Sequence, residues 1–221
     1  MTWMFLELCS ENKNMIVFSK NRKETNMDFR NDINDYISLE IETLKKLDVD
    51  AINEALNLLM ETARNHKRIY VFGNGGSSAT ASHIQNDFGK GVSEYVEDKF
   101  RFQCLNDNVP TVMAIANDIG FEEIFRFQLR GVIEPGDVVI AISGSGNSAN
   151  VINAVEYAKE QGNKIIGMTG FSGGKLKELS DISLHAPINS MQVTEDIHMI
   201  FDHLMMSMLY QHLCGIKHLQ K

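Results

Sequence analysis

The chain has 221 residues, of which 43% are hydrophobic and 23% charged, and its formal net charge is −8. This length suits one α/β domain, and the composition is that of an ordinary soluble globular protein. The acidic balance, without long runs of lysine and arginine, argues against nucleic acid or an anionic membrane as the main partner, and no segment approaches the roughly 20 apolar residues of a membrane span.

The first part of the chain differs from the rest in its pattern of apolar and polar residues. Residues 1–26 share no periodicity with the later residues, so we expect a disordered or loosely attached extension before a single domain over 27–221. The start has no basic segment and no cleavage site, which argues against a secretory signal. Three widely spaced cysteines, Cys9, Cys104 and Cys214, fit reduced thiols and a cytoplasmic location.

Hydrophobic periodicity predicts the elements in chain order. Two helices come first, over 31–47 and, after a capping Asp48 or Asp50, up to about residue 65. Short apolar runs then predict strands at 68–73, 100–105, 138–142, 164–168 and 182–184. They alternate with helices expected at 78–90, 109–117, 121–131, 148–161, 176–179 and 193–214. Strands that are apolar throughout and alternate with helices indicate a parallel sheet covered on both faces.

Two blocks rich in glycine and serine lie between a predicted strand and a predicted helix. The first reads GNGGS (73–77) and the second reads SGSGNS (143–148). Both fall at the carboxyl ends of strands, where parallel sheets form their ligand crevice. Neither is a nucleotide-binding sequence, because the Walker A lysine is absent and the GxGxxG spacing fails at Ser78. We therefore expect no nucleotide cofactor.

The second block can bind phosphate. Ser143, Ser145 and Ser148 alternate with glycines at a helix start, so hydroxyls and exposed amides can surround a dianion without a lysine. An ordinary cap, with Ser148 as the capping residue, explains this block about equally well by itself. The presence of two such blocks at one sheet edge favours phosphate binding.

These blocks, together with AND at 116–118 and TGFSGGKL at 169–176, resemble the SIS (sugar isomerase) domain of phosphoheptose isomerases over roughly residues 35–212. The resemblance implies a three-layer α/β/α sandwich with a five-stranded parallel sheet, preceded by N-terminal helices. It also implies a homotetramer with active sites between subunits. The implied reaction converts sedoheptulose 7-phosphate to D-glycero-D-manno-heptose 7-phosphate, with Zn(2+) in many members.

The resemblance assigns roles by position. Substrate contacts fall on both blocks and on the AND tripeptide, at Asn74, Gly75, Gly76, Ser77, Asn117, Asp118, Ser143, Gly144, Ser145 and Ser148. His83 and His203 match metal ligands, and His203 also matches the general acid. Two positions depart from the family: Asp87 replaces the catalytic glutamate, and Glu195 replaces a metal-binding glutamine. We therefore assign Asp87 as base or metal ligand, and Glu195 as metal ligand or substrate contact.

The spacing of these residues is compatible with those roles. His83 and Asp87 are four residues apart on a predicted helix and share a face. Most such pairs are exposed ion pairs of small energy, but this helix starts at the first glycine block and so borders the crevice. Glu195 lies eight residues before His203, with Asp196 as its rival, while His198 and Asp202 form another pair four residues apart. Two imidazoles and two carboxylates suit zinc.

The expected chemistry is aldose–ketose isomerisation through an enediol. A carboxylate removes the proton beside the carbonyl, and an acid or a metal ion stabilises the developing oxyanion. Two alternatives share the fold: a non-catalytic SIS module that senses a phosphosugar or acts as an adaptor, and an isomerase for a different phosphosugar. Asp87 and His203 are both ionisable, which favours an enzyme.

Overall fold

The computed structural model describes residues 27–213 and Gly215, so the predicted extension over 1–26 and two of the cysteines, Cys9 and Cys214, lie outside the described residues. The chain divides into two compact units, residues 1–36 and 37–221, and the second contains the sheet. The predicted domain boundary at residue 27 stays a prediction. Cys104 is a buried free thiol. Within the described part, no helix combines the length and the apolar character that crossing a bilayer requires.

Two helices precede the sheet, as predicted. Helix α2 spans Arg30–Leu44, and α3 spans Val49–Arg64. Asp48 caps α3, because its side chain accepts a hydrogen bond from the backbone N–H of Ala51. The buried face of α3 presents Ile52, Ala55, Leu59 and Ala63 to the core.

The sheet has five parallel strands in the order β2-β1-β3-β4-β5. They are β1 (Arg68–Gly73), β2 (Arg101–Cys104), β3 (Val138–Ser143), β4 (Lys164–Thr169) and β5 (Ile182–His185). Each predicted strand is therefore confirmed. The strand order reverses between β1 and β3, which is where an open parallel sheet forms its ligand crevice. Gly73 pairs with Ile142, so β1 and β3 end side by side at that point.

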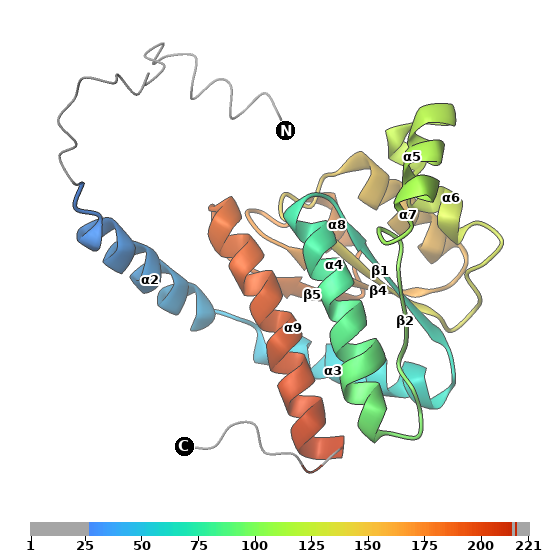
Figure 1. Cartoon of the computed structure of the whole chain (residues 1–221), viewed down its shortest axis with the longest axis horizontal. Helices are drawn as coiled ribbons and strands as arrows, with labels where there is room; N and C mark the ends of the chain where they lie inside the picture. The colour runs from blue at the N-terminus through green and yellow to red at the C-terminus, as the bar shows by residue number, and fades with distance from the viewer. Residues whose placement is uncertain (1–26, 214, 216–221) are drawn as a thin grey trace. The chain divides into compact units, whose positions relative to one another are not determined.

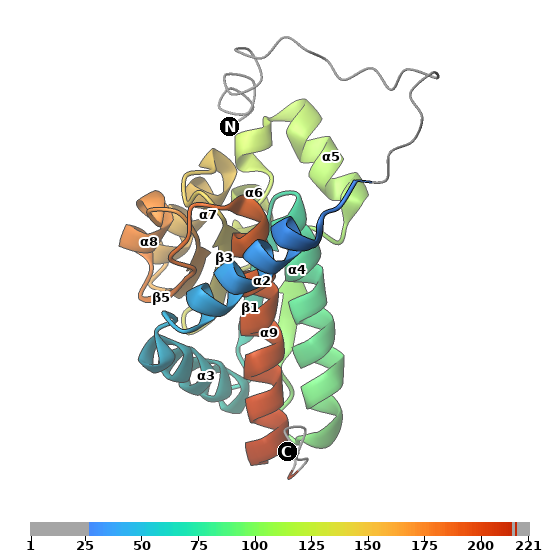
Figure 2. The same cartoon turned by 90° about the vertical axis from the view of Figure 1, so that its left-hand side faces the viewer.

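Helices cover both faces of this sheet, and the predicted sandwich is confirmed (Figures 1 and 2). One face packs against α3, α4 (Gly76–Asn86) and α9 (Met191–Leu213). The other packs against α5 (Val109–Asp118), α6 (Arg126–Leu129), α7 (Ala149–Glu160) and α8 (Gly174–Leu179). Side chains of a strand alternate between faces, so Ile69 and Val71 join the first cluster while Tyr70 and Phe72 join the second.

Two predicted helices differ from the observed ones. The helix expected at 78–90 starts at Gly76 and continues beyond Asn86 as a π-helix over Asp87–Gly91, followed by a 3-10 turn over Val92–Tyr95. The helix expected at 121–131 is wrong. A 3-10 turn over Phe121–Glu123 and the single turn of α6 replace it, because Arg130 is extended and Gly131 has a positive φ of 72°. The other predicted helices match to within a few residues.

Candidate active site

The two glycine- and serine-rich loops lie next to each other at the reversal point of the sheet. The loop after β1 and the loop after β3 are joined by the side chains of Asn74 and Asn150. Their amides exchange two hydrogen bonds, of 2.8 and 2.9 Å, and Asn150 is almost completely buried. The Asn150 oxygen also accepts from the backbone N–H of Val151. Asn74, predicted to bind substrate, thus also fixes one loop to the other.

The second loop has a backbone that requires glycine. Gly146 has a φ of 67°, and a Cβ there would overlap the carbonyl oxygen of Gly173. The Gly146 N–H donates to the carbonyl of Ser143, and its own carbonyl accepts from Leu176 at 2.9 Å. This loop is therefore held from both sides, by β3 and by the start of α8.

The hydroxyls of the second loop gather at the N-terminus of α7. Ser148 is the N-cap residue, but its side chain makes no capping bond. Its Oγ lies 3.1 Å from the Oγ of Ser143, and the Ser145 Oγ accepts from the backbone N–H of Asn147. The ordinary-cap alternative therefore lacks its characteristic hydrogen bond. A helix N-terminus without a side-chain cap, surrounded by hydroxyls, is a favourable position for an anion.

Helix α4 begins directly at the first loop. Its N-cap is Gly75, with a φ of 56° and no side-chain cap, while Ser77 is buried in the first turn. A Cβ at Gly76 would overlap the carboxyl group of Glu195, so that carboxylate lies against the start of α4. A negative charge is favourable at a helix N-terminus. Glu195 therefore lies at the predicted substrate turn, which is one of its two predicted roles.

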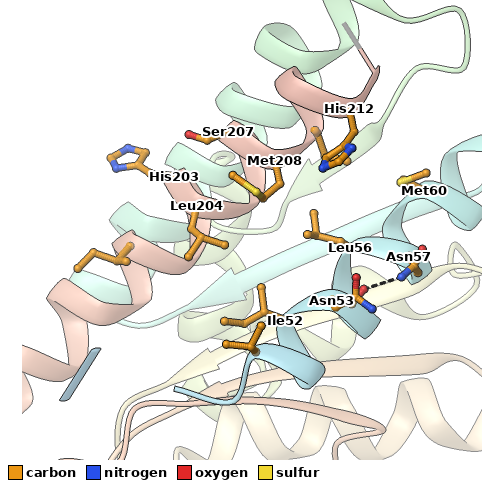
Figure 3. A pocket seen from close by; sticks show the side chains of 13 residues that line it. Ile52, Asn53, Leu56, Asn57, Met60, His203, Leu204, Ser207, Met208 and His212 are labelled. Atoms are coloured by element: carbon orange, nitrogen blue, oxygen red, sulfur yellow. Dashed lines mark hydrogen bonds between the residues drawn. The ribbon is translucent and has the colours of Figure 1, made fainter. Parts of the chain in front are cut away.

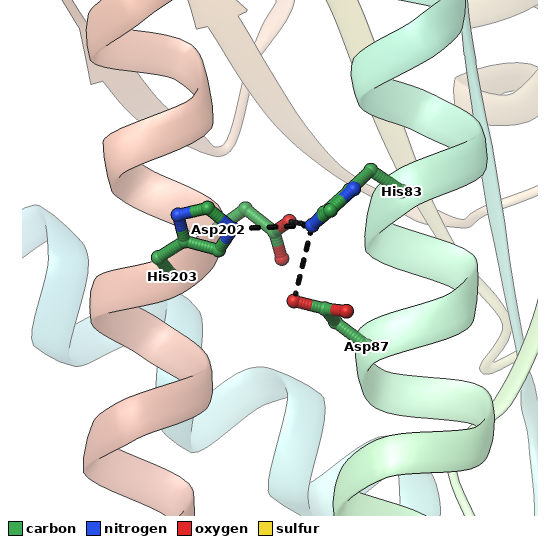
Figure 4. A group of neighbouring side chains, drawn as sticks. All are labelled: His83, Asp87, Asp202 and His203. Atoms are coloured by element: carbon green, nitrogen blue, oxygen red, sulfur yellow. Dashed lines mark hydrogen bonds and ion pairs between the residues drawn. The ribbon is translucent and has the colours of Figure 1, made fainter. Parts of the chain in front are cut away.

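Four ionisable side chains meet further along α4 and α9. The group consists of His83, Asp87, Asp202 and His203, whose ligand atoms all lie within 4.8 Å of one another (Figure 4). The Nε2 of His83 is 3.1 Å from the Nε2 of His203, 3.4 Å from Asp87 Oδ2 and 3.8 Å from Asp202 Oδ2. His83 and Asp87 share one face of the helix, and the neighbouring helix α9 supplies the other two.

Three of the four predicted metal ligands meet in this group, but Glu195 does not. The group contains Asp202 in its place. Eight residues of α-helix separate Glu195 and His203 by about 12 Å along the axis, although both lie near one face. The role of Glu195 as a metal ligand stays a prediction. Asp196, the alternative to Glu195 considered from the sequence, is exposed. The pKa of Glu40 is raised mainly by burial and to a smaller extent by the charge of Asp196.

The group fits a divalent metal ion. Asp202 is fully buried, and among the described residues neither of its oxygens has a hydrogen-bond partner. Burial, and after it the charge of Asp87, raises the pKa of Asp202 to about 7. Tetrahedral zinc with bonds of about 2.0–2.1 Å places its ligand atoms about 3.3 Å apart, close to the separations measured from His83. The structure thus contains a group that can hold a metal ion.

Comparison with known proteins identifies the family. Residues 32–170 match the family model described as SIS domain. A phosphoheptose isomerase from Rhodospirillum rubrum is 35% identical over 167 residues, which cover 75% of this chain and 87% of that protein. The chain belongs to the phosphoheptose isomerase family. The predicted family and the predicted enzyme class, an isomerase, are confirmed.

Solved structures of the phosphoheptose isomerase family agree with this fold. The enzyme from Neisseria gonorrhoeae has a TM-score of 0.76 at 29% identity, over 82% of this chain and 98% of that chain. The enzyme from Francisella tularensis also has a TM-score of 0.76 at 29% identity, over 84% and 100%. The likeness therefore extends over nearly the whole of each family member.

Two predicted substrate contacts of this phosphoheptose isomerase family member lie at the end of α5. Asn117 and Asp118 are exposed at the end of α5, where the Asn117 amide donates to Asp118 at 2.7 Å. Within residues 27–213, no hydrogen bond found in the structure connects this pair to either loop. Their role in substrate binding stays a prediction.

One more ionisable residue is buried in α9. His198 is 1% exposed and packs beside the backbone of Thr169, with His185 nearby. Burial lowers its pKa to about 4, so the imidazole is neutral in the folded protein at neutral pH. His198 lies one turn before Asp202, and the two buried groups have pKa values shifted in opposite senses.

Proposed function

We propose that this protein interconverts sedoheptulose 7-phosphate and D-glycero-D-manno-heptose 7-phosphate in the crevice between β1 and β3. One observation carries the proposal: the N-termini of α4 and α7, neither of them capped by a side chain, are joined by the Asn74–Asn150 pair. Further along α4, about 10 Å from Gly76, lies His83 of the four-residue group. A seven-carbon sugar phosphate can extend over such a distance.

The phosphate would bind at the second loop. Hydroxyls of Ser143, Ser145 and Ser148 and the amides at the start of α7 would hold it, and the first loop and Glu195 would contact the sugar. Holding the substrate by its far end converts binding energy into orientation of the reacting carbons.

The proton transfers would use the four-residue group. Asp87 removes the proton from the carbon beside the carbonyl and returns it to the neighbouring carbon, while His203 transfers the proton between the two oxygens. The group of His83, Asp87, Asp202 and His203 would hold Zn(2+), which when bound stabilises negative charge on the substrate oxygen.

The substrate is tested by turnover. We expect conversion of sedoheptulose 7-phosphate, and no conversion of sedoheptulose without its phosphate. Ser145→Ala should raise KM about 10- to 100-fold with a smaller change in kcat, because it removes a hydrogen bond to a charged group. Ser180→Ala is the control, since that hydroxyl donates to the carbonyl of Leu176 within the last turn of α8. Turnover of another phosphosugar, or binding without turnover, would favour one of the two alternatives.

We also propose that the protein is a cytoplasmic homotetramer with active sites between subunits. An apolar groove of about 850 Å³ runs between α3 and α9 and includes His203 (Figure 3). Ile52, Leu56, Leu204 and Met208 line it, and a second copy packed there would enclose the side of the group that His203 exposes. The expected result is a molar mass four times 24.9 kDa by sedimentation equilibrium. A monomer at working concentration would contradict this proposal.

A further inference from the structure

The second glycine- and serine-rich loop (143–148) has its carbonyl oxygens engaged by the protein. Four consecutive carbonyls accept hydrogen bonds, those of Ser143, Gly144, Ser145 and Gly146. Backbone N–H groups supply three of these bonds, of 2.8 to 2.9 Å. The fourth donor is a side chain, because the Nδ2 of Asn147 donates to the Ser145 carbonyl at 3.0 Å. A carbonyl oxygen facing a phosphate would repel it, so a loop that binds an anion needs these oxygens directed to other donors.

Asn147 connects this loop to the start of α8. Its Nδ2 donates to the Ser145 carbonyl, and its backbone N–H donates to the Ser145 Oγ at 3.2 Å. Its Oδ1 accepts from the backbone N–H of Lys175 at 3.0 Å, in the first turn of α8. The N-cap residue of α8, Gly173, has no side chain that could cap the helix, so Asn147 supplies the hydrogen bond that a capping residue would otherwise make.

The hydrogen bonds of Asn147 determine what Ser145 can offer to an anion. The Ser145 Oγ accepts from the Asn147 N–H, so the hydroxyl proton remains available for donation. The Ser145 carbonyl oxygen is engaged by the Asn147 amide. The only acceptor of the Asn147 side chain, its Oδ1, is in turn engaged by Lys175. Ser145 is therefore left with its donor free and its carbonyl occupied, which is the arrangement that a phosphate requires.

We propose that Asn147 is a positioning residue for the phosphate site and acts through Ser145, without touching the phosphate. The inference rests on the phosphate assignment of the proposed function and deepens it. Both polar atoms of the Asn147 side chain have protein partners, which is why we assign it no direct contact with the ligand. Without this side chain the Ser145 carbonyl loses its donor and α8 loses its cap, so the loop would hold an anion less tightly.

Asn147→Ala tests the inference in the full-length chain. We expect KM for sedoheptulose 7-phosphate to rise about tenfold and kcat to stay within about threefold, because the phosphate is bound away from the reacting carbons. The Kd of inorganic phosphate, measured by a phosphorus NMR titration, should rise by the same factor. A purely structural role would instead lower the folded fraction, which reduces the apparent kcat and leaves KM and the phosphate Kd unchanged. That result would overturn the inference.

Two further variants complete the test. Asn153→Ala removes an amide on α7 that donates to the Glu122 carbonyl at 3.2 Å, so its KM and phosphate Kd should equal those of the unmodified chain. Asn147→Asp keeps an acceptor for Lys175 and covers the case in which the alanine variant does not fold. Its second oxygen replaces the donor to Ser145, so phosphate binding should weaken by at least about tenfold. Full phosphate affinity in Asn147→Asp would show that only the cap of α8 matters and would contradict the proposal.

The phosphate titration does not depend on turnover. An unmodified chain that binds phosphate through a loop sensitive to Asn147, without converting the heptose, would refute the proposed substrate and leave this inference standing. If the unmodified chain and both Asn147 variants gave the same result in the titration, the inference would fail whatever the turnover.

Discussion

Asp87→Asn is expected to lower kcat for sedoheptulose 7-phosphate by about 10³-fold while KM changes only a few-fold, because the amide has nearly the shape of the carboxylate but cannot accept the proton from the carbon beside the carbonyl. Within the four-residue group, Asp87 Oδ2 lies 3.4 Å from His83 Nε2, and Asp87 is the first residue of a π-helix, a distortion found often at functional sites. Steady-state kinetics of the purified variant measures both constants.

The control for this variant is Glu94→Gln. It makes the same carboxylate-to-amide change in the next turn of the chain, where Glu94 is exposed and paired with Lys90. We expect its kcat to equal that of the unmodified chain. If Asp87→Asn kept more than a tenth of the activity, the base would lie elsewhere, and Glu195 would be the first residue to examine.

In zinc-free protein, the free energy of unfolding is expected to stay nearly level between pH 4 and 6.5, because two buried groups oppose each other. The pKa of His198 is lowered to about 4, so below pH 6.5 the unfolded chain binds a proton that the folded chain does not bind. The free energy of unfolding therefore falls by about 3 kcal/mol as the pH decreases from 6.5 to 4. The pKa of Asp202 is raised to about 7, so the folded chain keeps a proton that the unfolded chain loses near pH 4. Stability from Asp202 therefore falls as the pH rises through the same range.

Single substitutions separate the two effects. Asp202→Asn should leave the histidine effect alone, so its unfolding free energy rises by about 3 kcal/mol from pH 4 to 6.5. His198→Gln should show the reverse slope over that range. Urea unfolding at several pH values, with chelator present, gives these slopes, and the slope matters rather than the absolute stability. A level profile in both variants would show that neither group titrates as its burial implies.

The sequence predicts the sheet and both loops because each depends on local patterns. Apolar runs define the strands, and glycine with serine at their ends marks the turns into α4 and α7. The helix expected at 121–131 fails because its apolar spacing does not reveal that the chain becomes extended at Arg130. Tertiary context decides where such a segment stops.

The fourth member of the ionisable group shows what a one-dimensional pattern omits. Glu195 and His203 are close in angle around α9 and about 12 Å apart along its axis, and whether they share a site stays a prediction. The sequence shows Asp202 four residues after His198 but does not assign it a function. Its burial and its direction toward α4 depend on how the two helices pack, and that packing is set by the core beneath them.

The amide pair between Asn74 and Asn150 has a consequence for how a sugar phosphate is received. Because it ties the turn after β1 to the turn after β3, two hydrogen bonds hold the starts of α4 and α7 side by side. The binding site for the phosphate is therefore preformed, and a ligand does not have to order the two loops separately when it binds. Sugars of other lengths would have to be accommodated at the opposite end, by the side chains of α9.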